Sequence, residues 1–441
     1  MCALAWLCSV ASAQPSATPP IDPPPTDPPT PDAPPTAPPT RGSDDPSTTD
    51  YRDVLADPPP ARAASDGDPP TATARAGAYH DSDQTTVWRL LGNIAQTYGQ
   101  FELSAGLGVD AVTSASVDVR SSPALSKVDT VTSASGRSST SGGTMTDTRY
   151  QGTFGAGWKG SDGRAVSLTS AVAKETDYAS VSGGINGSFD VLDRTTTILG
   201  GVTLTDNWVS SVIDTTIHRK MFATAWSAGV ARVLTPDDAI RVRYDGKLSA
   251  GYLASPYRNV RFGDWTASLG TQQITFMNTI GSVGGLPEHE PESRLSSAVV
   301  AEWVHSLALG IGLHPEVRVS HDSWSVDSLT AGIDLRVARP GWRLQTGYRF
   351  YTQSAANFFS DKYIQDSAMY PYYTSDKELG RQVGHLGQID LSFVAIEPDT
   401  VGDSRLLLNL QLDAVHYSYP GFVLLPSRDS FFVSAGLSWE H

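Results

Sequence analysis

The sequence predicts an all-β fold, a transmembrane antiparallel β-barrel of about 14 strands, with 16 strands as the alternative count. Two patterns carry this prediction. Apolar and polar residues alternate through most of the chain after residue 99, and the connections between the alternating segments are by turns long and short. A third observation is the acidic, proline-rich N-terminal part, which predicts a disordered segment ahead of the barrel.

Residues 1–13 have the composition of a signal peptide. The segment MCALAWLCSVASA is apolar and ends in Ala11-Ser12-Ala13, although a positively charged start is missing and a chance apolar segment is the alternative. Cleavage after Ala13 would remove Cys2 and Cys8, the only two cysteines in the sequence. The mature protein would then contain neither a catalytic thiol nor a cysteine-ligated metal.

Residues 14–84 differ in composition from everything that follows them. They contain 19 of the 30 prolines, and 12 aspartates against 4 arginines, with no lysine or glutamate. Such a segment cannot bury enough apolar surface to fold, so we expect a disordered periplasmic linker with polyproline character. The linker is either a plain spacer or a contact to the cell wall or to a periplasmic protein.

Residues 85–98, TTVWRLLGNIAQTY, fit two structures. Leu90, Leu91 and Ile94 lie on one stripe of a helix, whereas Trp88, Leu90 and Ile94 lie on one face of a strand. A short helix would leave the count of 14 unchanged. An extra strand would need a partner and would favour 16.

Residues 99–441 carry the alternation that defines the predicted outer-membrane barrel. It is clearest in residues 101–111, 150–158, 240–252 and 406–412. The segments are about 9–15 residues long, the span that a tilted membrane strand requires. No stretch approaches the roughly 18 uncharged apolar residues of a membrane-spanning helix.

The connections between these segments alternate in length. Long or medium connections are expected near residues 113–147, 206–220, 256–292, 321–325, 353–384 and 418–430. Short turns are expected near residues 160–163, 193–194, 235–238 and 338–341. Outer-membrane barrels have long external loops and short periplasmic turns, so this parity favours a barrel over a soluble sandwich. The connection at Asp177 departs from the pattern, because it is short where a long one is expected.

Aromatic residues gather near the predicted strand ends. Trp158, Trp303, Trp342 and Trp439 fall beside short turns, and Tyr150, Phe222, Tyr252, Tyr417 and Phe431 fall beside long loops. Two aromatic girdles at the membrane interfaces would give this distribution. The final segment, 431–439, alternates and ends near Trp439, as strands that guide barrel insertion do.

Charged residues on the other strand face predict the lining of a lumen. The candidates are Arg241, Arg243, Asp245, Lys247, Glu302, Glu316, Arg318, Asp334, Arg336, Arg343, Arg349, Asp390 and Asp413. Both signs are interspersed, so these groups either set a field across an open pore or pair with each other and close it. Within 348–351, Arg349 and Tyr351 are expected to point inward, and Tyr348 and Phe350 toward lipid.

Other chemistries have weak support. The net charge of −15, without a basic patch, excludes a typical nucleic-acid binder. His321-Asp322 resembles the acid-base pair of some barrel enzymes, but a single dipeptide is poor support for catalysis. Glu288-His289-Glu290 with Glu292 would suit a divalent cation, yet such a run is more often a solvated loop. We expect no catalytic residue, no bound metal and no cofactor.

Six stretches resemble an uncharacterised, domain-of-unknown-function family of predicted bacterial outer-membrane proteins. They are DAVTSASVDV (110–119), GYLASPYRNV (251–260), PESRLSSAV (291–299), SHDSWSVDSLT (320–330), YRFYTQSAANFF (348–359) and SDKEL (375–379). The resemblance spans about residues 80–441 and implies a barrel in the outer membrane, without implying a substrate. In 251–260, Tyr257 or Arg258 is expected to tie a long loop to the barrel rim.

These observations predict a non-enzymatic outer-membrane β-barrel of a Gram-negative bacterium, a channel or binding protein for small solutes. Its expected partners are outer-membrane lipid and the barrel-insertion machinery. The alternative is a structural or surface-interaction envelope protein, with a closed lumen and with loops or an N-terminal tail that bind partners. A barrel enzyme and a soluble secreted β-protein are the remaining readings.

Overall fold

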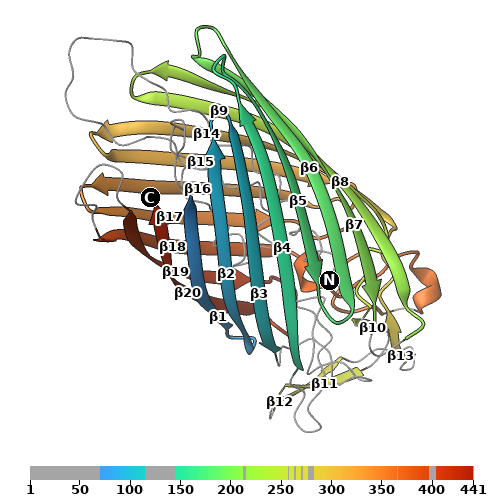
Figure 1. Cartoon of the computed structure of the whole chain (residues 1–441). Coiled ribbons are helices and arrows are strands. Elements are labelled where there is room, and N and C mark those ends of the chain that lie inside the picture. Colours follow the sequence, from blue (N-terminus) through green and yellow to red (C-terminus); the bar gives the residue numbers. More distant parts are fainter. Residues whose placement is uncertain are drawn as a thin grey trace, which may run out of the picture.

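A computed structural model describes residues 70–114, 145–211, 215–256, 258–262, 265–269, 272–276, 283–364, 366–396 and 404–440. Within these ranges, sixteen antiparallel strands close into one barrel (Figure 1). The predicted fold class is confirmed, with the larger of the two strand counts. The predicted signal peptide and residues 14–69 of the predicted linker lie outside the described residues.

The barrel strands follow one another around the wall in chain order. The first nine are β1 (Thr71–Asp81), β2 (Thr85–Tyr98), β3 (Phe101–Ser114), β4 (Met145–Lys159), β5 (Arg164–Lys174), β6 (Tyr178–Val191), β7 (Thr196–Ser210), β8 (His218–Thr235) and β9 (Asp238–Gly251). The other seven are β14 (Ser293–Ala308), β15 (Ile311–Asp322), β16 (Asp327–Arg339), β17 (Trp342–Gln353), β18 (Gln382–Ile396), β19 (Arg405–Ser418) and β20 (Ser427–Glu440).

The count of 14 is wrong because the barrel begins earlier than residue 99. Residues 85–98 form β2, which pairs along its length with β1 and β3, so the helix alternative is also wrong. The linker boundary at residue 84 is too late, since β1 starts at Thr71. The outward face of β1 is almost entirely alanine, which gives too little hydropathy contrast for the alternation to be seen.

The barrel closes where β1 pairs with β20, from Thr71 opposite Glu440 to Asp81 opposite Ser430. All connections at one end are short except 397–404, and we call this the short-turn end. The other end, the long-loop end, carries the long connections 115–144, 252–292 and 354–381. The expected parity is therefore present, and the connection 175–177 at Asp177 is short at the long-loop end.

The two faces of the barrel wall differ in chemistry. Large apolar side chains are exposed on the outer face, for example Trp88 (65% exposed), Leu90 (62%) and Leu107 (75%). On the inner face of neighbouring strands, Arg89 and Asp110 are buried and form an ion pair of 2.6 Å. A water-soluble protein has the opposite arrangement, with apolar side chains inside.

The aromatic residues confirm the girdle pattern in part. Trp303, Trp342, Tyr150, Phe222 and Phe431 expose between 37% and 59% of their surface, near the ends of the strands. Tyr417 was expected among them, and that expectation is wrong. It lies on the inner face of β19, 4% exposed, and its ring stacks on Tyr419. Alternation from Leu410 and Leu412, which face outward, places residue 417 inside.

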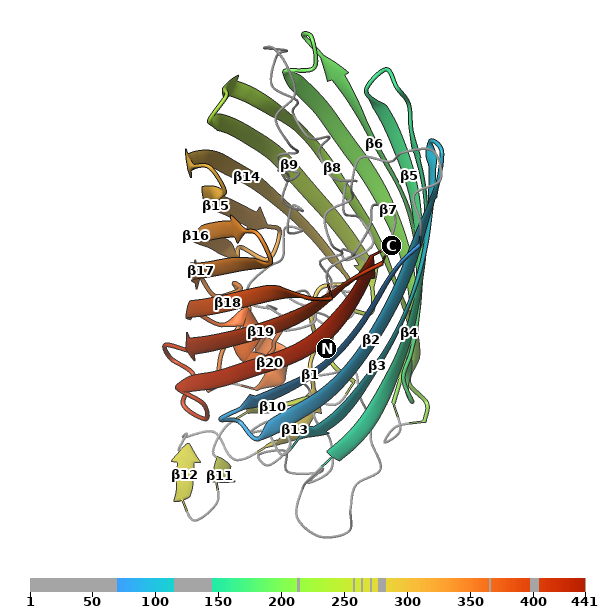
Figure 2. The ribbon, with the colours of Figure 1, turned by 60° about the vertical axis from the view of Figure 1, so that its left-hand side comes forward.

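Two long connections fold over the long-loop end. Residues 252–292 contain β10 (Asn259–Phe262) paired with β13 (Val283–Pro287), and β11 (Trp265–Leu269) paired with β12 (Gln272–Phe276). Residues 354–381 contain two short 3₁₀ helices, η2 (Ser367–Met369) and η3 (Lys377–Leu379). Both views show the β11–β12 hairpin beyond the ends of the barrel strands (Figures 1 and 2). Among the described residues, no helix has the length and apolarity that a membrane crossing would need.

Candidate functional site

The charged residues expected to line a lumen all lie on one continuous part of the inner wall. They come from β9 and β14–β18, with Asp413 on β19, on the strand face opposite the exposed apolar residues. We call the inner face of β9 and β14–β19 the charged wall. The sequence located this face because strong charges alternate there with large apolar residues.

The structure brings several of the thirteen residues together as ion pairs. Arg241 pairs with Glu302 on the next strand. Arg243 and Arg318 both contact Asp245, at 2.8 Å and 3.5 Å. In the next group, Arg336 and Asp334 lie 3.9 Å apart.

Other residues among the thirteen lumen-lining candidates accept hydrogen bonds from side-chain amides or form no ion pair. Glutamine amides donate to carboxylates from Gln345 to Asp334 (3.3 Å), from Gln388 to Asp390 (3.4 Å) and from Gln411 to Asp413 (3.0 Å). Arg343, Arg349 and Glu316 make no ion pair with any residue that the structure describes. Lys247 is buried on the same face of β9. The wall is thus a mixed lining, partly self-neutralised and partly free to meet a solute.

The inner face of β5, β6 and β7 has a different lining, which we call the hydroxyl wall. Most of its side chains are serine, threonine, alanine, asparagine and glycine, and Leu199, Val209 and Asp190 lie on the same face. Apart from the aspartate, these residues carry no charge, so they do not stand out in the sequence as the charged wall does. The signal that was available is the run of hydroxyl and amide residues at every second position, as in Thr203, Thr205 and Asn207.

Burial of the inner wall changes along the barrel axis. Near the long-loop end, Thr85 (0% exposed) on β2 and Tyr351 (2%) on β17 are buried. Near the short-turn end, Thr97 on β2 and Arg343 on β17 are half-buried. The long-loop end of the barrel is therefore filled, whereas burial at the opposite end is mixed, since Leu407 and Ser438 are buried there.

The filling is the loop assembly, by which we mean the described residues of 252–292 and 354–381. At its centre, Arg258 Nη1 lies 2.6 Å from Asp376 Oδ2 and 3.3 Å from Glu288 Oε2. Thr374 Oγ1 donates to Glu288 Oε1 at 2.6 Å. The backbones of the two segments also pair, since His289 and Tyr373 exchange N–H···O bonds of 3.1 and 2.8 Å. One arginine thus joins two loops that are far apart in sequence.

The carboxyls around Arg258 titrate differently. Burial raises the pKa of Glu288 above its ordinary value, against the opposing charge of Arg258. Burial raises the pKa of Glu290 well above its ordinary value, and the carboxylates of Glu288 and Asp376 raise it further. Burial would also raise the pKa of Asp376, but Arg258 and then Lys377 hold it below its ordinary value. Asp376 is therefore the permanent partner of Arg258.

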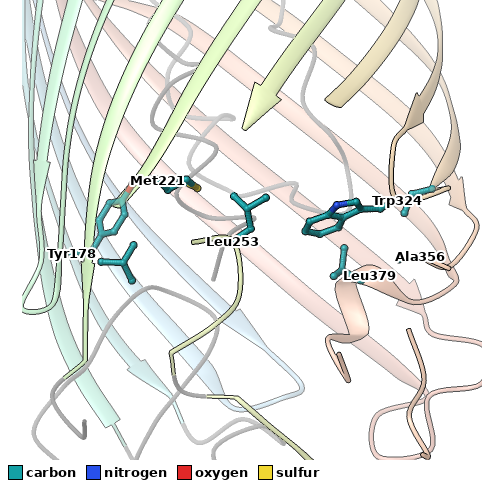
Figure 3. Close-up of a cluster of buried hydrophobic side chains, with 8 residues drawn as sticks. Tyr178, Met221, Leu253, Trp324, Ala356 and Leu379 are labelled. Carbon is teal, nitrogen blue, oxygen red and sulfur yellow. The ribbon is translucent and has the colours of Figure 1, made fainter. Parts of the chain in front are cut away.

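An apolar cluster joins the loop assembly to the barrel rim (Figure 3). Leu253 from one loop lies between Met221 of β8 and Trp324, which is in the β15–β16 turn, and Leu379 from the other loop lies beneath Trp324. The Trp324 ring contacts Phe358 edge-on, with centroids 5.1 Å apart, and carries the Arg294 guanidinium 4.6 Å above it. The cluster therefore reaches across the mouth.

Polar contacts fix residues 354–381 to the opposite part of the wall. The amide of Gln353 donates to the carbonyls of Glu378 (2.8 Å) and Gly380 (2.7 Å), and that of Gln382 donates to the carbonyl of Glu378 (2.9 Å). Both glutamines are on the inner ends of β17 and β18. Loop 354–381 is therefore hydrogen-bonded to the wall itself.

A second group of aromatic rings packs inside the loop assembly. Phe262 is buried, and its ring centroid lies 5.1 Å from Tyr363, 6.1 Å from Tyr370 and 5.0 Å from Tyr373. The Tyr363 hydroxyl donates to the carbonyls of Phe358 and Thr374, at 2.6 Å and 2.9 Å. These contacts hold residues 252–292 and 354–381 as one packed unit.

The acid-base pair considered at His321-Asp322 does not form. His321 lies on the outer face, where Nδ1 is 2.7 Å from Asp327 Oδ1. Asp322 is on the inner face, 5% exposed, where it pairs with Arg294 and accepts the N–H groups of Trp324 and Val326. Successive residues of a strand point to opposite faces, which explains the separation.

The run Glu288-His289-Glu290 is not a solvated loop. Glu288 and Glu290 are buried, and Glu288 is engaged by Arg258, so the arginine takes the place expected for a cation. Arg258 was expected to tie a loop to the rim. Instead it ties one loop to the other. Tyr257 lies outside the described residues.

One group of carboxylates among the described residues has the spacing of metal ligands. Oxygen atoms of Asp147, Glu175 and Asp177 all lie within 4.8 Å of one another at the long-loop end. Arg149 Nη1 is 3.5 Å from Glu175 Oε1 and supplies positive charge there. The Thr176 hydroxyl also donates to Asp147 at 2.8 Å. These contacts make the group part of the rim.

The motifs that suggested a family meet in the loop assembly. Arg258 of GYLASPYRNV binds Asp376 of SDKEL. Trp324 of SHDSWSVDSLT packs on Phe358 of YRFYTQSAANFF and under Arg294 of PESRLSSAV. Five of the six stretches thus contribute to one structural unit; DAVTSASVDV lies at the end of β3 and partly outside the described residues.

Several solved structures resemble the chain in outline. They include the CymD monoaromatic hydrocarbon channel (8% identity, TM-score 0.39, covering 86% of this chain and 89% of that one) and a bacterial polysaccharide outer membrane secretin (7%, 0.43, 84% and 98%). A third is the Pseudomonas putida toluene transporter TodX (9%, 0.35, 85% and 89%). With TM-scores below 0.5, these likenesses carry nothing about the activity of this chain.

No curated protein matches the chain. A family model does match, over residues 55–388, which is most of the sequence and begins earlier than the expected residue 80. It includes the five stretches that build the loop assembly and the whole of the charged wall up to β17. The chain belongs to the family described as protein of unknown function DUF3570.

Proposed function

We propose that this protein is an outer-membrane barrel that admits or binds small solutes, and that its loop assembly controls access at the long-loop end. The observation that carries the location is the inside-out wall, with leucine, tryptophan and phenylalanine exposed outside and charged groups inside. Lipid is the solvent in which such an outer face is stable. Outer-membrane lipid and the insertion machinery are accordingly its proposed partners.

The two ends of the barrel support the solute role. Half-buried charged groups near the short-turn end, such as Arg343, can exchange hydrogen bonds with a solute. The long-loop end is filled by a packed unit in which Arg258 joins the two loops. A polar interior with a discrete, loop-built barrier is what a regulated pore or a binding protein requires. A non-enzymatic role is proposed with it, since His321 and Asp322 face opposite ways.

Conductance in planar bilayers tests the proposal. Purified, folded protein should give small, discrete current steps, and Arg258→Ala should give larger or longer openings. Heat-modifiable migration on a gel serves as the control for a folded barrel. Silence of both proteins, with folded barrels, would reject a solute pathway.

The alternative is an envelope protein whose lumen stays closed and whose loops or N-terminal segment bind partners. The buried contacts of the loop assembly favour it, because Val260, Thr374 and Phe262 are all at most 1% exposed. Removal of residues 14–70 should then abolish the capture of cell wall or of a periplasmic protein and leave insertion intact. A deletion without effect on capture makes this segment a spacer.

A further inference from the structure

We propose that the hydroxyl wall is a binding surface for a neutral, hydroxyl-rich solute such as a sugar. The surface is formed by Thr169, Ser182, Asn186, Thr203 and Thr205, on β5, β6 and β7. This inference deepens the proposed function and rests on it, because a solute must first reach the interior of the barrel.

The strand register brings these residues into one patch. Thr169 and Thr203 both lie opposite Gly184, on either side of β6. On the next rung toward the long-loop end, Ser182 lies opposite Thr205. Residues opposite each other on antiparallel strands have Cβ atoms about 5 Å apart, so the hydroxyls form a continuous polar surface.

The patch is buried and its polar atoms lack protein partners. Ser182 is 4% exposed, Asn186 3%, and Thr203 and Thr205 1% each. The hydroxyls of Thr169, Ser182, Thr203 and Thr205 and the Asn186 amide nitrogen find no hydrogen-bond partner in the part of the chain that the structure describes. Buried polar groups in native proteins are nearly always paired. Water or a solute in the barrel interior must supply partners for these five groups, and that molecule must both donate and accept hydrogen bonds.

Two glycines make room for the polar side chains of the neighbouring strands. A Cβ added to Gly184 would lie 2.7 Å from the Thr203 hydroxyl and 3.0 Å from the Thr169 hydroxyl. Asn186 likewise extends its carboxamide over Gly201. The glycines therefore allow the hydroxyl and amide groups of three strands to lie close together.

The charge of the surface selects the class of solute. None of the five residues is ionisable, whereas the charged wall carries many charges of both signs. A charged solute would be attracted to the charged wall, where unpaired groups such as Arg349 can meet it. A neutral solute gains most from hydroxyl and amide groups, which provide donors and acceptors without a desolvation cost for an ion.

The patch lies next to the loop assembly, so a solute bound to it would lie directly inside the long-loop end. One rung further toward the long-loop end, Ser180 lies opposite Asn207, whose side chain bonds Tyr178 and the carbonyl of Met221. Tyr178 and Met221 belong to the apolar cluster that contacts Leu253 of the loop assembly. The hydroxyl wall therefore begins directly next to the loop assembly, on the side toward the short-turn end.

Isothermal titration of the folded, full-length protein in detergent tests the inference. The probes are maltose and sucrose as neutral solutes, and gluconate and lysine as charged ones. We expect the sugars to bind more tightly than the charged probes. The double variant Thr203→Val/Thr205→Val, which keeps side-chain shape and removes two hydroxyls, should bind the sugars about tenfold more weakly.

Control variants separate binding from folding. Thr73→Val makes the same change on the inner face of β1, away from the patch, and should leave sugar affinity unchanged. If the double variant does not fold, Thr205→Val alone should weaken sugar binding, and Thr203→Ser, which keeps the hydroxyl, should preserve it.

The outcomes are distinct from those of the conductance test. Equal sugar affinity in the wild type and in the valine variants overturns the proposed surface. Tighter binding of gluconate or lysine than of the sugars, or no sugar binding at all, overturns the proposed solute class. Hydroxyl-dependent sugar binding by a protein that is silent in bilayers supports this surface and rejects only the conducting pathway.

Discussion

The two sides of the inner wall hold the loop assembly in different ways. On the charged side, residues 354–381 are hydrogen-bonded to the inner ends of β17 and β18 through Gln353 and Gln382. On the side of the hydroxyl wall, contact is made by apolar groups, chiefly Met221 of β8 and Leu253. On the hydroxyl side, the backbone N–H of Tyr252 also donates to the carbonyl of Lys220 on β8, at 2.9 Å. We predict that, if the assembly opens, it parts first on the hydroxyl side, where burial of apolar groups provides most of the contact.

Arg258→Ala should have the largest effect on this arrangement. The substitution leaves Asp376 and Glu288 buried without their shared cation, and breaking a buried ion pair typically costs about 3–5 kcal/mol. Hydrogen exchange of residues 286–292 should rise strongly, because they lose their link to residues 374–376. Unchanged exchange there would show that the backbone pairing of His289 and Tyr373 is sufficient.

Met221→Ala should be next in size. Met221 is 1% exposed in the cluster that includes Leu253, and truncation of a buried methionine costs about 2–5 kcal/mol. If the assembly parts on this side, limited proteolysis should cut near residue 253 faster, with cleavage within 377–381 unchanged. Equal acceleration at both places would contradict an attachment on the charged side.

The pH dependence of the loop assembly tests its carboxyls. Because the pKa of Glu290 is raised in the assembled state, its contribution is most favourable below the ordinary value of 4.5 and is lost as the pH rises through the raised pKa. Asp376 has a lowered pKa, so its contribution is lost only as the pH falls below 3.8. The protection of residues 286–292 from hydrogen exchange, corrected for the intrinsic pH dependence of amide exchange, should therefore decrease as the pH rises from 4.5.

Glu290→Gln is the matched variant for that experiment. The amide keeps the shape and cannot ionise, so the decrease of protection with pH should be reduced. A variant that retains the full decrease would assign the titration to another group.

The smallest effect is expected from Arg349→Gln. Arg349 is half-buried on the charged wall and has no ion-pair partner among the described residues, so its loss should cost less than about 1 kcal/mol in stability. In a salt gradient, the reversal potential should move toward cation selectivity. Arg164→Gln, at an exposed position near a short turn, should leave it unchanged.

Alternation in the sequence was enough to place strands whose two faces differ strongly in hydropathy. Arg241 and Arg243 could be placed on one face because Ile240 and Val242 occupy the other. The same rule missed β1, whose outward residues are mostly alanines, which are small and only weakly apolar. It also passed over the hydroxyl wall, where serine, threonine and glycine are neither clearly polar nor clearly apolar.

The loop assembly was beyond prediction for another reason. Glu288 and Thr374 are 86 positions apart, and no local pattern specifies that they meet. The sequence did single out the stretches involved, through their likeness to a family, and it associated Arg258 with a loop contact. Which partner each residue finds depends on how two irregular segments pack together, and periodicity carries no information about that.

The junction of β1 with β20 has a consequence for how the wall is assembled. Every other pairing in the barrel joins strands that follow one another along the chain, whereas this one brings together Thr71 and Glu440. The wall can therefore grow as a series of hairpins and needs a single long-range event to finish. In the complete ring, each of the sixteen strands pairs with two neighbours, so no pairing differs from the others in kind. A circular permutant with new termini at residues 340–341, and with the old ends joined, should therefore form the same barrel. In that variant, the pairing of β16 with β17 would close the ring.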